Sequence, residues 1–267
     1  TVSHVNMPII RNLPIDPPSV EEQKRVAGML AAYDSLIENN RKQIKLLEEA
    51  AQRLYKEWFI DLRFPGHEYT EIDPETGLPE GWISGSLGDL VSEGGRRESK
   101  NHRENYQYYL PIDAIPSKSM ISWESAPIEE AESSLVSFRK GQFLFGAMRP
   151  YFHKVIIAPF EGLTRTTCFV LQENESSYKH YAYALLYDSK SVQYATAISV
   201  GTTTPYVRWS DFRKMPVAIP QPAIAEEFSR AVEPYLKEVS AKSLQLKLAR
   251  ESRNRLLPKL IEGQVAF

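Results

Sequence analysis

Two long stretches of the chain place apolar side chains at alternating steps of four and three residues. The first stretch, residues 21–60, keeps this spacing with Asn40 as the one polar position. Its apolar positions are Val26, Leu30, Tyr33, Ile37, Ile44, Leu47, Ala51, Leu54 and Trp58. A repeat of about 3.5 residues is typical of helices that pair as a coiled coil. We therefore predict a long helix with a buried apolar seam, started by a capping box between Ser19 and Glu22.

A second stretch, residues 224–261, repeats the pattern with two charged exceptions. Its seam positions are Phe228, Val232, Tyr235, Val239, Lys242, Leu246, Ala249, Arg253, Leu256 and Leu260. Pro234 lacks a backbone N–H and predicts either a helix start near Glu233 or a kink. The two helices are expected to pair antiparallel if the chain between them is a compact domain with neighbouring ends. Asn40 then either sets the register of the pair or is a tolerated, hydrated amide.

The segment between the helices, residues 82–222, has the mixed pattern of an α/β domain. Runs rich in aromatic and β-branched residues predict strands at 106–112, 142–148, 153–160 and 165–173. Residues 176–198 predict one helix, followed by a loop that contains Gly201 and Pro205. Residues 65–81 form an acidic linker rich in proline and glycine. The predicted fold class is α+β: a mixed α/β domain flanked by two long helices that form an antiparallel coiled coil.

Composition narrows the classes of protein. Hydrophobic residues make up 42% and charged residues 25% of the 267 positions, which is ordinary for a globular protein. No run approaches the roughly 18 apolar residues of a membrane span, and no secretory signal is visible, so a cytoplasmic protein without membrane contact is expected. The single cysteine, Cys168, lies in an apolar run and is expected to be a buried thiol. Apart from Asp16-Pro17-Pro18, no motif predicts a catalytic residue, a metal site or a cofactor.

A repeat links the two ends of the chain. Pro14 aligns with Pro216 at an offset of 202 residues. After a proline loop that differs in length, Glu22 aligns with Glu227 at an offset of 205 residues. Residues 1–20 are therefore expected to be the tail of a second, missing copy of the middle domain.

Five segments, in this order and repetition, carry a resemblance to a known family. They are "LPIDPPSVEEQKRVAGMLAAYDSLIENN", "RLYKEWFIDLRFPG", "LPEGWISGSLGDL", "GTTTPYVRWSDFRKMPVAIPQP" and "RLLPKLIEGQV". The chain resembles the specificity (S) subunits of type I restriction–modification systems, which carry two target-recognition domains, each followed by a long helix. The implied parts are a tail of a first recognition domain (1–20), a central helix (21–64), a linker (65–81), a target-recognition domain (82–222) and a C-terminal helix (223–267).

The resemblance implies a DNA-recognition subunit that has no catalytic activity of its own. Its one recognition domain is expected to read half of a bipartite target in double-stranded DNA, while the coiled coil sets the spacer to a second reader. The expected partners are methylation (M) subunits and, through them, restriction (R) subunits. The chain is expected to be either the C-terminal part of a full subunit or a half-subunit that forms a homodimer. Charges off the seam are candidate contacts with the methylation subunits: Glu38, Arg41, Lys45, Glu48 and Glu49.

Positive charge gathers in a few segments although the net charge is −2. Local basic faces, rather than a basic average, are what a polyanion requires. The candidate DNA-binding residues are Arg96, Arg97, Lys100, Arg103, Arg149, Lys154, Arg165, Thr202, Thr203, Thr204 and Tyr206. The cations are candidates for phosphate or guanine contacts, and the threonine loop resembles a recurrent segment of the family. For each residue the alternative is an ordinary solvated or structural side chain. The acids between 124 and 132 are expected to face away from DNA.

Two other functions remain open. Asp16-Pro17-Pro18 matches the core of an amino-group methyltransferase motif, which would make the chain an adenine-N6 DNA methyltransferase. The aromatic residue that would stack on a flipped adenine is missing, and the prolines equally suit the end of a strand before a helix. The second alternative is a coiled-coil scaffold whose middle domain binds another protein instead of DNA.

Overall fold

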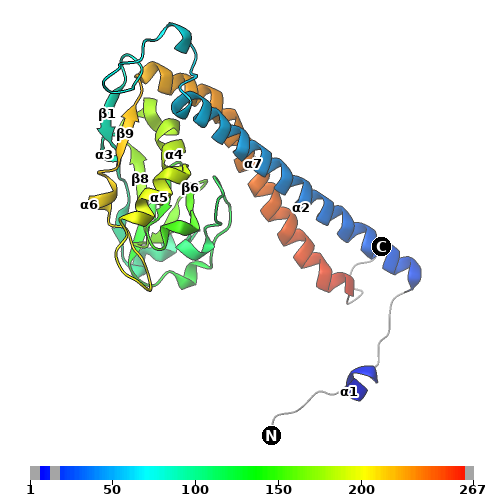
Figure 1. Ribbon diagram of the computed structural model, residues 1–267. Helices are drawn as coiled ribbons and strands as arrows, with labels where there is room; N and C mark the ends of the chain where they lie inside the picture. Colours follow the sequence, from blue (N-terminus) through cyan, green and yellow to red (C-terminus); the bar gives the residue numbers. More distant parts are fainter. Residues whose placement is uncertain (1–6, 13–18, 262–267) are drawn as a thin grey trace. The chain divides into compact units, whose positions relative to one another are not determined.

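The computed structural model describes residues 7–12 and 19–261. The chain divides into two compact units, a larger one formed by residues 39–248 and a smaller one formed by residues 1–38 and 249–267. The larger unit contains all the strands, and the smaller unit contains the outer ends of two long helices (Figure 1). The Asp16-Pro17-Pro18 motif lies outside the described residues.

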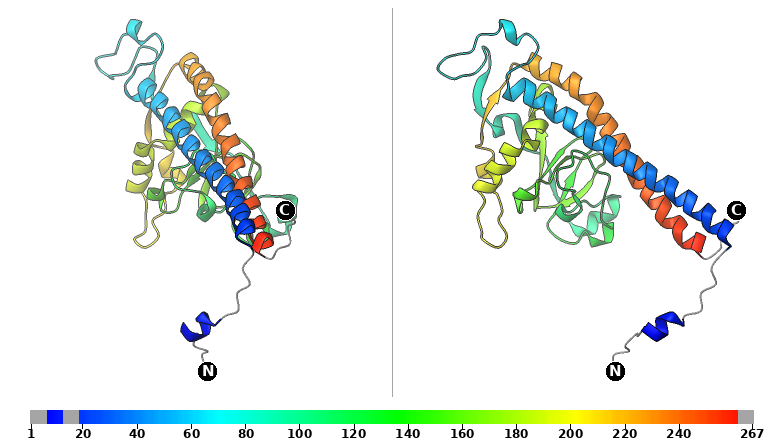
Figure 2. Two further views of the ribbon diagram at one scale, coloured as in Figure 1. Left: turned by 90° about the vertical axis from the view of Figure 1, so that its right-hand side faces the viewer. Right: turned by 45° about the vertical axis from the view of Figure 1, so that its right-hand side comes forward.

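The long helices of the sequence pattern are α2 (Val20–Tyr55) and α7 (Pro222–Ile261). Within each unit they lie side by side and antiparallel, which the views in Figure 2 make clear. None of the ten predicted seam positions of α2 is exposed, so the predicted seam is confirmed. The capping box is confirmed as well, because Ser19 N–H donates to the Glu22 carboxylate at 2.8 Å and Glu22 N–H donates to Ser19 Oγ at 3.2 Å. In the smaller unit, Arg253 donates to the Asp34 carboxylate at 2.7 Å.

Helix α7 differs from its prediction in two respects. It begins at Pro222, so a helix start near Glu233 is wrong. Tyr235 is 37% exposed, whereas Leu236 is only 5% exposed and takes the buried position. The reason is that α7 also packs against the domain: Trp123 Nε1–H donates to the Ser240 carbonyl at 3.1 Å. Its buried stripe is therefore wider than the seam of a two-stranded coiled coil.

The repeat is visible in local structure. Helix α1 (Met7–Arg11) and helix α6 (Trp209–Phe212) begin 202 residues apart, and so do α2 and α7. The same short helix therefore precedes each long helix. That residues 1–20 are the tail of a related domain stays a prediction.

Nine antiparallel strands form three small sheets in the larger unit. They are β1 (Ile83–Ser86), β2 (Val91–Glu93), β3 (Arg96–Glu98), β4 (Leu135–Phe138), β5 (Phe143–Gly146), β6 (Val155–Ile157), β7 (Gly162–Arg165), β8 (Cys168–Glu173) and β9 (Pro216–Ile219). The sheet orders are β2-β8-β5-β6, β3-β4-β7 and β1-β9. The pair β1-β9 joins the two ends of the domain next to the long helices, which explains why the helices can pair.

Three of the four predicted strands are confirmed, as β5, β6 and β8. The prediction of a strand at 106–112 is wrong, because this segment forms only isolated bridges at Tyr109 and then turns into a 3-10 helix after Pro111. The predicted helix 176–198 is two helices, α4 (Lys179–Tyr187) and α5 (Ser189–Ala197). Asp188 separates them, since its carboxylate accepts the Lys190 N–H at 2.7 Å and caps α5.

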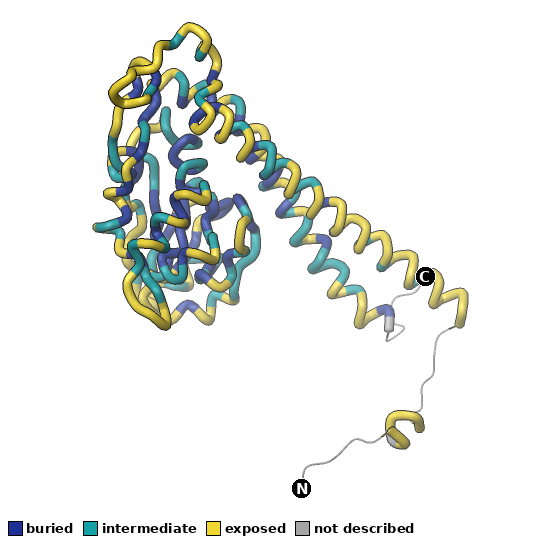
Figure 3. The backbone as a smooth tube through the Cα atoms, viewed as in Figure 1, coloured by how far each residue is buried: buried dark blue, intermediate teal, exposed yellow. Residues whose placement is uncertain are grey.

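An aromatic cluster holds the long helices against the domain. After α2 the chain forms one turn of π-helix, Lys56–Ile60, and this extra residue per turn buries both Trp58 and Phe59. The Phe59 ring lies 4.5 Å from Tyr181 of α4 and 4.9 Å from Phe228 of α7, measured between centroids. The Tyr181 hydroxyl donates to the Ala218 carbonyl of β9. The cluster belongs to the main core of the larger unit, which Figure 3 shows in dark blue.

The predicted position of Glu48 on the outer face of α2 is wrong. Its side chain lies inward and the residue is only 8% exposed. One carboxylate oxygen accepts the backbone N–H of Met120 at 2.7 Å and the hydroxyl of Ser119 at 3.3 Å. Burial raises the pKa of Glu48 to about 7, although these hydrogen bonds act in the opposite direction. Glu48 therefore fastens α2 to the domain and is not available as an outer contact.

Cys168 is buried as expected, and burial raises its thiol pKa to about 12. Within the described part of the chain, no helix is long and apolar enough to cross a membrane. Residues 7–12 and 19–261 also hold no group of three or more His, Cys, Asp or Glu side chains that could bind a metal ion.

Replacing Leu236 by alanine tests the corrected seam. Leu236→Ala should lower the free energy of unfolding by about 2–5 kcal/mol, because it leaves a cavity between α7 and the rest of the core. Tyr235→Ala is the matched control and should cost less than about 1 kcal/mol. Urea unfolding of both variants measures the difference. Equal losses would support the original seam.

The buried carboxyl group of Glu48 should make the free energy of unfolding depend on pH. Its pKa is 4.5 in the unfolded chain and about 7 in the folded one, so the folded state favours the protonated acid. The contribution of Glu48 to stability should therefore be largest below about pH 4.5 and be lost as the pH rises through about 7, by roughly 3 kcal/mol in total. Unfolding of wild type and Glu48→Gln at pH 5 and pH 8 measures this: the variant should lose less stability between the two. Glu49→Gln, at a half-exposed neighbour, should behave as wild type.

Candidate nucleic-acid interface

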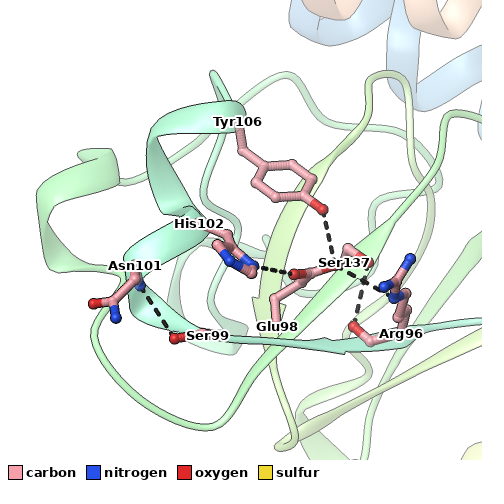
Figure 4. Close-up of polar contacts among 7 residues, drawn as sticks. All are labelled: Arg96, Glu98, Ser99, Asn101, His102, Tyr106 and Ser137. Carbon is pink, nitrogen blue, oxygen red and sulfur yellow. Dashed lines mark hydrogen bonds and ion pairs between the residues drawn. The ribbon is translucent and has the colours of Figure 1, made fainter.

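The first basic segment is built around one carboxylate. Strand β3 pairs with β4 and carries Arg96 and Glu98 on the same face. Glu98 is largely buried and accepts the Tyr106 hydroxyl at 3.1 Å (Figure 4). The same carboxylate lies 3.4 Å from His102 Nδ1 and 4.0 Å from Arg96 Nε. Ser137 Oγ closes the cluster by donating to the Arg96 carbonyl at 3.2 Å. Glu98 thus orders the segment and offsets part of its positive charge.

The remaining cations of this segment divide into two kinds. Arg97 and Lys100 are exposed, and Arg97 lies on the opposite face of β3 from Arg96. Arg103 is half-buried and donates to the Glu129 carbonyl at 3.0 Å. The acidic segment 124–132 therefore touches the basic one at Glu129. Arg103 links the two segments, so its guanidinium is already partly used inside the domain.

A second group of predicted residues comes together at one end of the domain. The turn 148–154 and the loop 199–206 join there, because Arg149 N–H donates to the Pro205 carbonyl at 2.7 Å and its guanidinium to the Thr203 carbonyl at 3.4 Å. Met148 and Val200 each form a bridge with Tyr206. Figure 1 shows this loop, which follows α5, in yellow at the lower end of the larger unit.

A third segment, the turn 165–167, completes this surface. Met148 N–H donates to the Thr167 carbonyl at 3.3 Å, and the Tyr206 hydroxyl lies 3.4 Å from the Thr166 carbonyl. Arg165 is exposed at the end of β7, and its guanidinium donates to Ser133 Oγ at 3.3 Å. We call the turn 148–154, the loop 199–206 and the turn 165–167 together the loop surface.

The loop surface exposes some of the predicted side chains and not others. Thr202, Thr203 and Thr204 are all exposed, so their hydroxyls face solvent. Lys154 is half-buried, and its ammonium group donates to the Ile112 carbonyl at 2.7 Å. Burial raises the pKa of the Tyr206 hydroxyl, which therefore stays a hydrogen-bond donor at neutral pH.

Sequence analysis missed two side chains of the loop surface. Tyr151 and Phe152 are 49% and 46% exposed, and their rings pack 4.8 Å apart. They follow Arg149 and Pro150 in "AMRPYFHK". An aromatic pair between cations, next to a proline that sets a turn, was the signal that could have identified them.

Comparison with protein families gives a direct match to this domain. Residues 79–247 match the model of the type I restriction modification DNA specificity domain. This range covers more than half of the chain and includes every strand and both candidate regions.

Individual relatives agree with this match. The chain is 31% identical to the type I restriction enzyme MjaIX specificity subunit of Methanocaldococcus jannaschii, across 96% of this chain and 61% of that protein. It is 25% identical to the MjaVIII specificity subunit of the same organism, across 86% of this chain and 56% of that protein. The chain thus spans less than two thirds of the length of these relatives.

A solved structure shares the fold. The crystal structure of a type I restriction-modification system S subunit from M. genitalium matches 91% of this chain and 61% of its own, with a TM-score of 0.53 at 13% identity. The strands, the long helices and the match across residues 79–247 therefore lead to one assignment: the chain belongs to the family of type I restriction–modification DNA specificity domains.

Proposed function

We propose that this chain is a DNA-recognition subunit that reads one half of a bipartite target and leaves methylation and cleavage to other subunits. The loop surface carries the proposal. Arg149, Arg165 and the hydroxyls of Thr202–Thr204 converge there from three separate segments of a specificity domain. Arg165 is exposed and Arg149 is half-buried. Arginines that reach solvent can neutralise phosphates, and an arginine or a hydroxyl can also read base edges in the major groove. Such a subunit acts where the DNA is, in the cytoplasm.

The long helices are proposed as the spacer between two readers. Helix α2 has 36 residues and α7 has 40, which corresponds to about 54 and 60 Å of helix. Residues 82–222 form the reader in this proposal, 21–64 and 223–267 the spacer helices, 65–81 a linker, and 1–20 the tail of a first reader. That first reader comes either from the rest of a longer chain or from a second copy of this one.

Methylation subunits, and restriction subunits through them, are the proposed protein partners. Their candidate contacts on α2 are the off-seam charges Glu38, Arg41, Lys45 and Glu49. A methyltransferase role for the chain itself is not favoured, because the relatives are named specificity subunits. A scaffold without DNA affinity is the alternative that binding experiments must exclude.

The dependence of DNA binding on salt tests the proposed phosphate contacts. The complex with methylation subunits should select duplexes from a randomised pool, and its affinity for a selected duplex should fall with salt. Arg149→Ala and Arg165→Ala should each reduce the slope of log K against log salt by about one. Lys237→Ala is the control, since Lys237 lies on α7 in an ion pair with Glu233. Failure to select any duplex, or unchanged slopes, would contradict the proposal.

The length of the helix pair should determine the spacer of the target. Asp34 and Arg253 face each other in the smaller unit, so seven residues inserted beside each would lengthen the pair by one heptad. Seven residues add about 10.5 Å of helix, or about three base pairs of B-DNA. Methylome sequencing of a host with the intact system should report the same half-sites with a spacer longer by about three base pairs. An unchanged spacer would refute the spacer role.

A further inference from the structure

The turn between Arg149 and His153 combines three unusual features. Within residues 19–260, Tyr151 and Phe152 are the only exposed large apolar side chains that are adjacent in sequence. Arg149 and His153, which flank them, both have left-handed backbone conformations with φ of 50° and 52°. A non-glycine residue in this conformation costs free energy and persists only where the surrounding structure holds it.

Backbone strain gathers around the loop surface as a whole. Five non-glycine residues of the described chain have positive φ. Arg149 and His153 lie in the loop surface, and Lys118 and Ser134 are hydrogen-bonded to it. Lys118 N–H donates to the His153 carbonyl at 2.9 Å, and Thr166 N–H donates to the Ser134 carbonyl at 3.0 Å. Such concentration of strain in one place is typical of functional sites rather than of connecting loops.

The same turn holds buried polar atoms that lack partners. Arg149 Nε and His153 Nε2 are buried without a hydrogen-bond partner among the described residues. Burial also lowers the pKa of His153 and so favours the neutral form of its ring. Buried polar atoms without partners are uncommon in proteins and are destabilising. Two strained backbone positions and two unpaired buried polar atoms therefore occur in the same turn as two solvent-exposed aromatic rings.

Rigidity distinguishes this turn from an ordinary mobile loop tip. The Phe152 N–H donates to the Arg149 carbonyl at 3.0 Å and the His153 N–H to the Pro150 carbonyl at 2.8 Å. Pro150 is buried, and the His153 ring packs 4.8 Å from the ring of Tyr187 in α4. The rings are thus carried on a fixed backbone, so they lose little conformational entropy when they contact a partner.

Charge decides between a protein and a nucleic acid as the partner. Three cations belong to the surroundings of the rings. Arg149 precedes Tyr151 by two residues, and Lys118 lines a pocket together with Tyr151 and His153. Arg165 is part of the same loop surface. The negative charge of Asp188 raises the pKa of His153. The Asp188 carboxylate also accepts a hydrogen bond from the Lys190 N–H and so caps helix α5. Aromatic rings framed by cations fit stacked bases between phosphates.

We infer that Tyr151 and Phe152 form a wedge that inserts at a base step of duplex DNA beside the groups contacted by Arg149 and the threonine loop. This inference rests on the proposed function and extends it from charge and hydroxyl contacts to the deformability of the target. A wedge favours steps that unstack easily, so the rings contribute to sequence choice without hydrogen bonds to base edges.

The test uses the complex with methylation subunits and a duplex that the wild-type complex selects from a randomised pool. The double variant Tyr151→Ala/Phe152→Ala should bind that duplex roughly 10- to 100-fold more weakly, which is the size of aromatic–base stacking contributions. Its salt slope should equal that of wild type, because neutral side chains release no counterions, whereas Arg149→Ala reduces the slope. The swap Tyr151→Phe/Phe152→Tyr keeps both rings and should restore affinity. Tyr69→Ala, at a 93% exposed aromatic in the acidic linker, is the matched control.

A second readout reports the base step directly. 2-Aminopurine placed along the selected duplex should brighten at one step with wild type and the ring-keeping swap, and not with the double alanine variant. Unchanged affinity of the double variant, or an equal loss in the ring-keeping swap, would overturn the wedge while leaving DNA recognition intact. Loss of methylation-subunit assembly with DNA affinity retained would assign the rings to a protein contact. A wild-type complex that selects no duplex would overturn the proposed function and the wedge together.

Discussion

The packing of Phe59 between Tyr181 and Phe228 is the contact on which the rest of the larger unit depends. Three rings from three elements meet there: the end of α2, helix α4 of the domain and the start of α7. Because the centroids are only 4.5 and 4.9 Å apart, neither helix can rotate without opening the core. The π-helical turn at Lys56–Ile60 is what makes this possible, since it turns two successive aromatic residues inward.

Polar contacts then orient the helices on the domain. Glu48 of α2 accepts the Met120 N–H, and the Ser240 carbonyl of α7 accepts the indole N–H of Trp123. Both contacts end in the same connecting segment, so residues 119–123 are held from both helices at once. Tyr183 adds a third contact, because its hydroxyl donates to the Met120 carbonyl at 2.8 Å. For a protein proposed to measure distance along DNA, a reader fixed to its spacer in this way is a useful property.

Several predictions were based on local patterns in the amino-acid sequence. The seam of α2, the capping box of Ser19 and the strands β5, β6 and β8 were predictable, because heptad spacing, cap residues and apolar runs are local signals. Strand β3 was not among the predicted strands, since its residues are charged and its partner β4 lies some 40 positions away. Tyr235 was misplaced for a related reason: the heptad rule assumes one partner helix, and α7 has two neighbours.

The sequence by itself determined the class of the fold, the two long helices, the internal repeat and the family resemblance, because each is written as a spacing or an order along the chain. Only the tertiary structure decided which polar groups face inward and which segments meet. Glu48 and Lys154 look solvated in sequence, yet both bind backbone groups distant in the chain. The loop surface likewise exists only once the turn between β5 and β6, the turn between β7 and β8 and the loop after α5 come together. Burial and long-range hydrogen bonding depend on which residues are neighbours in space, and a local sequence pattern does not identify those neighbours.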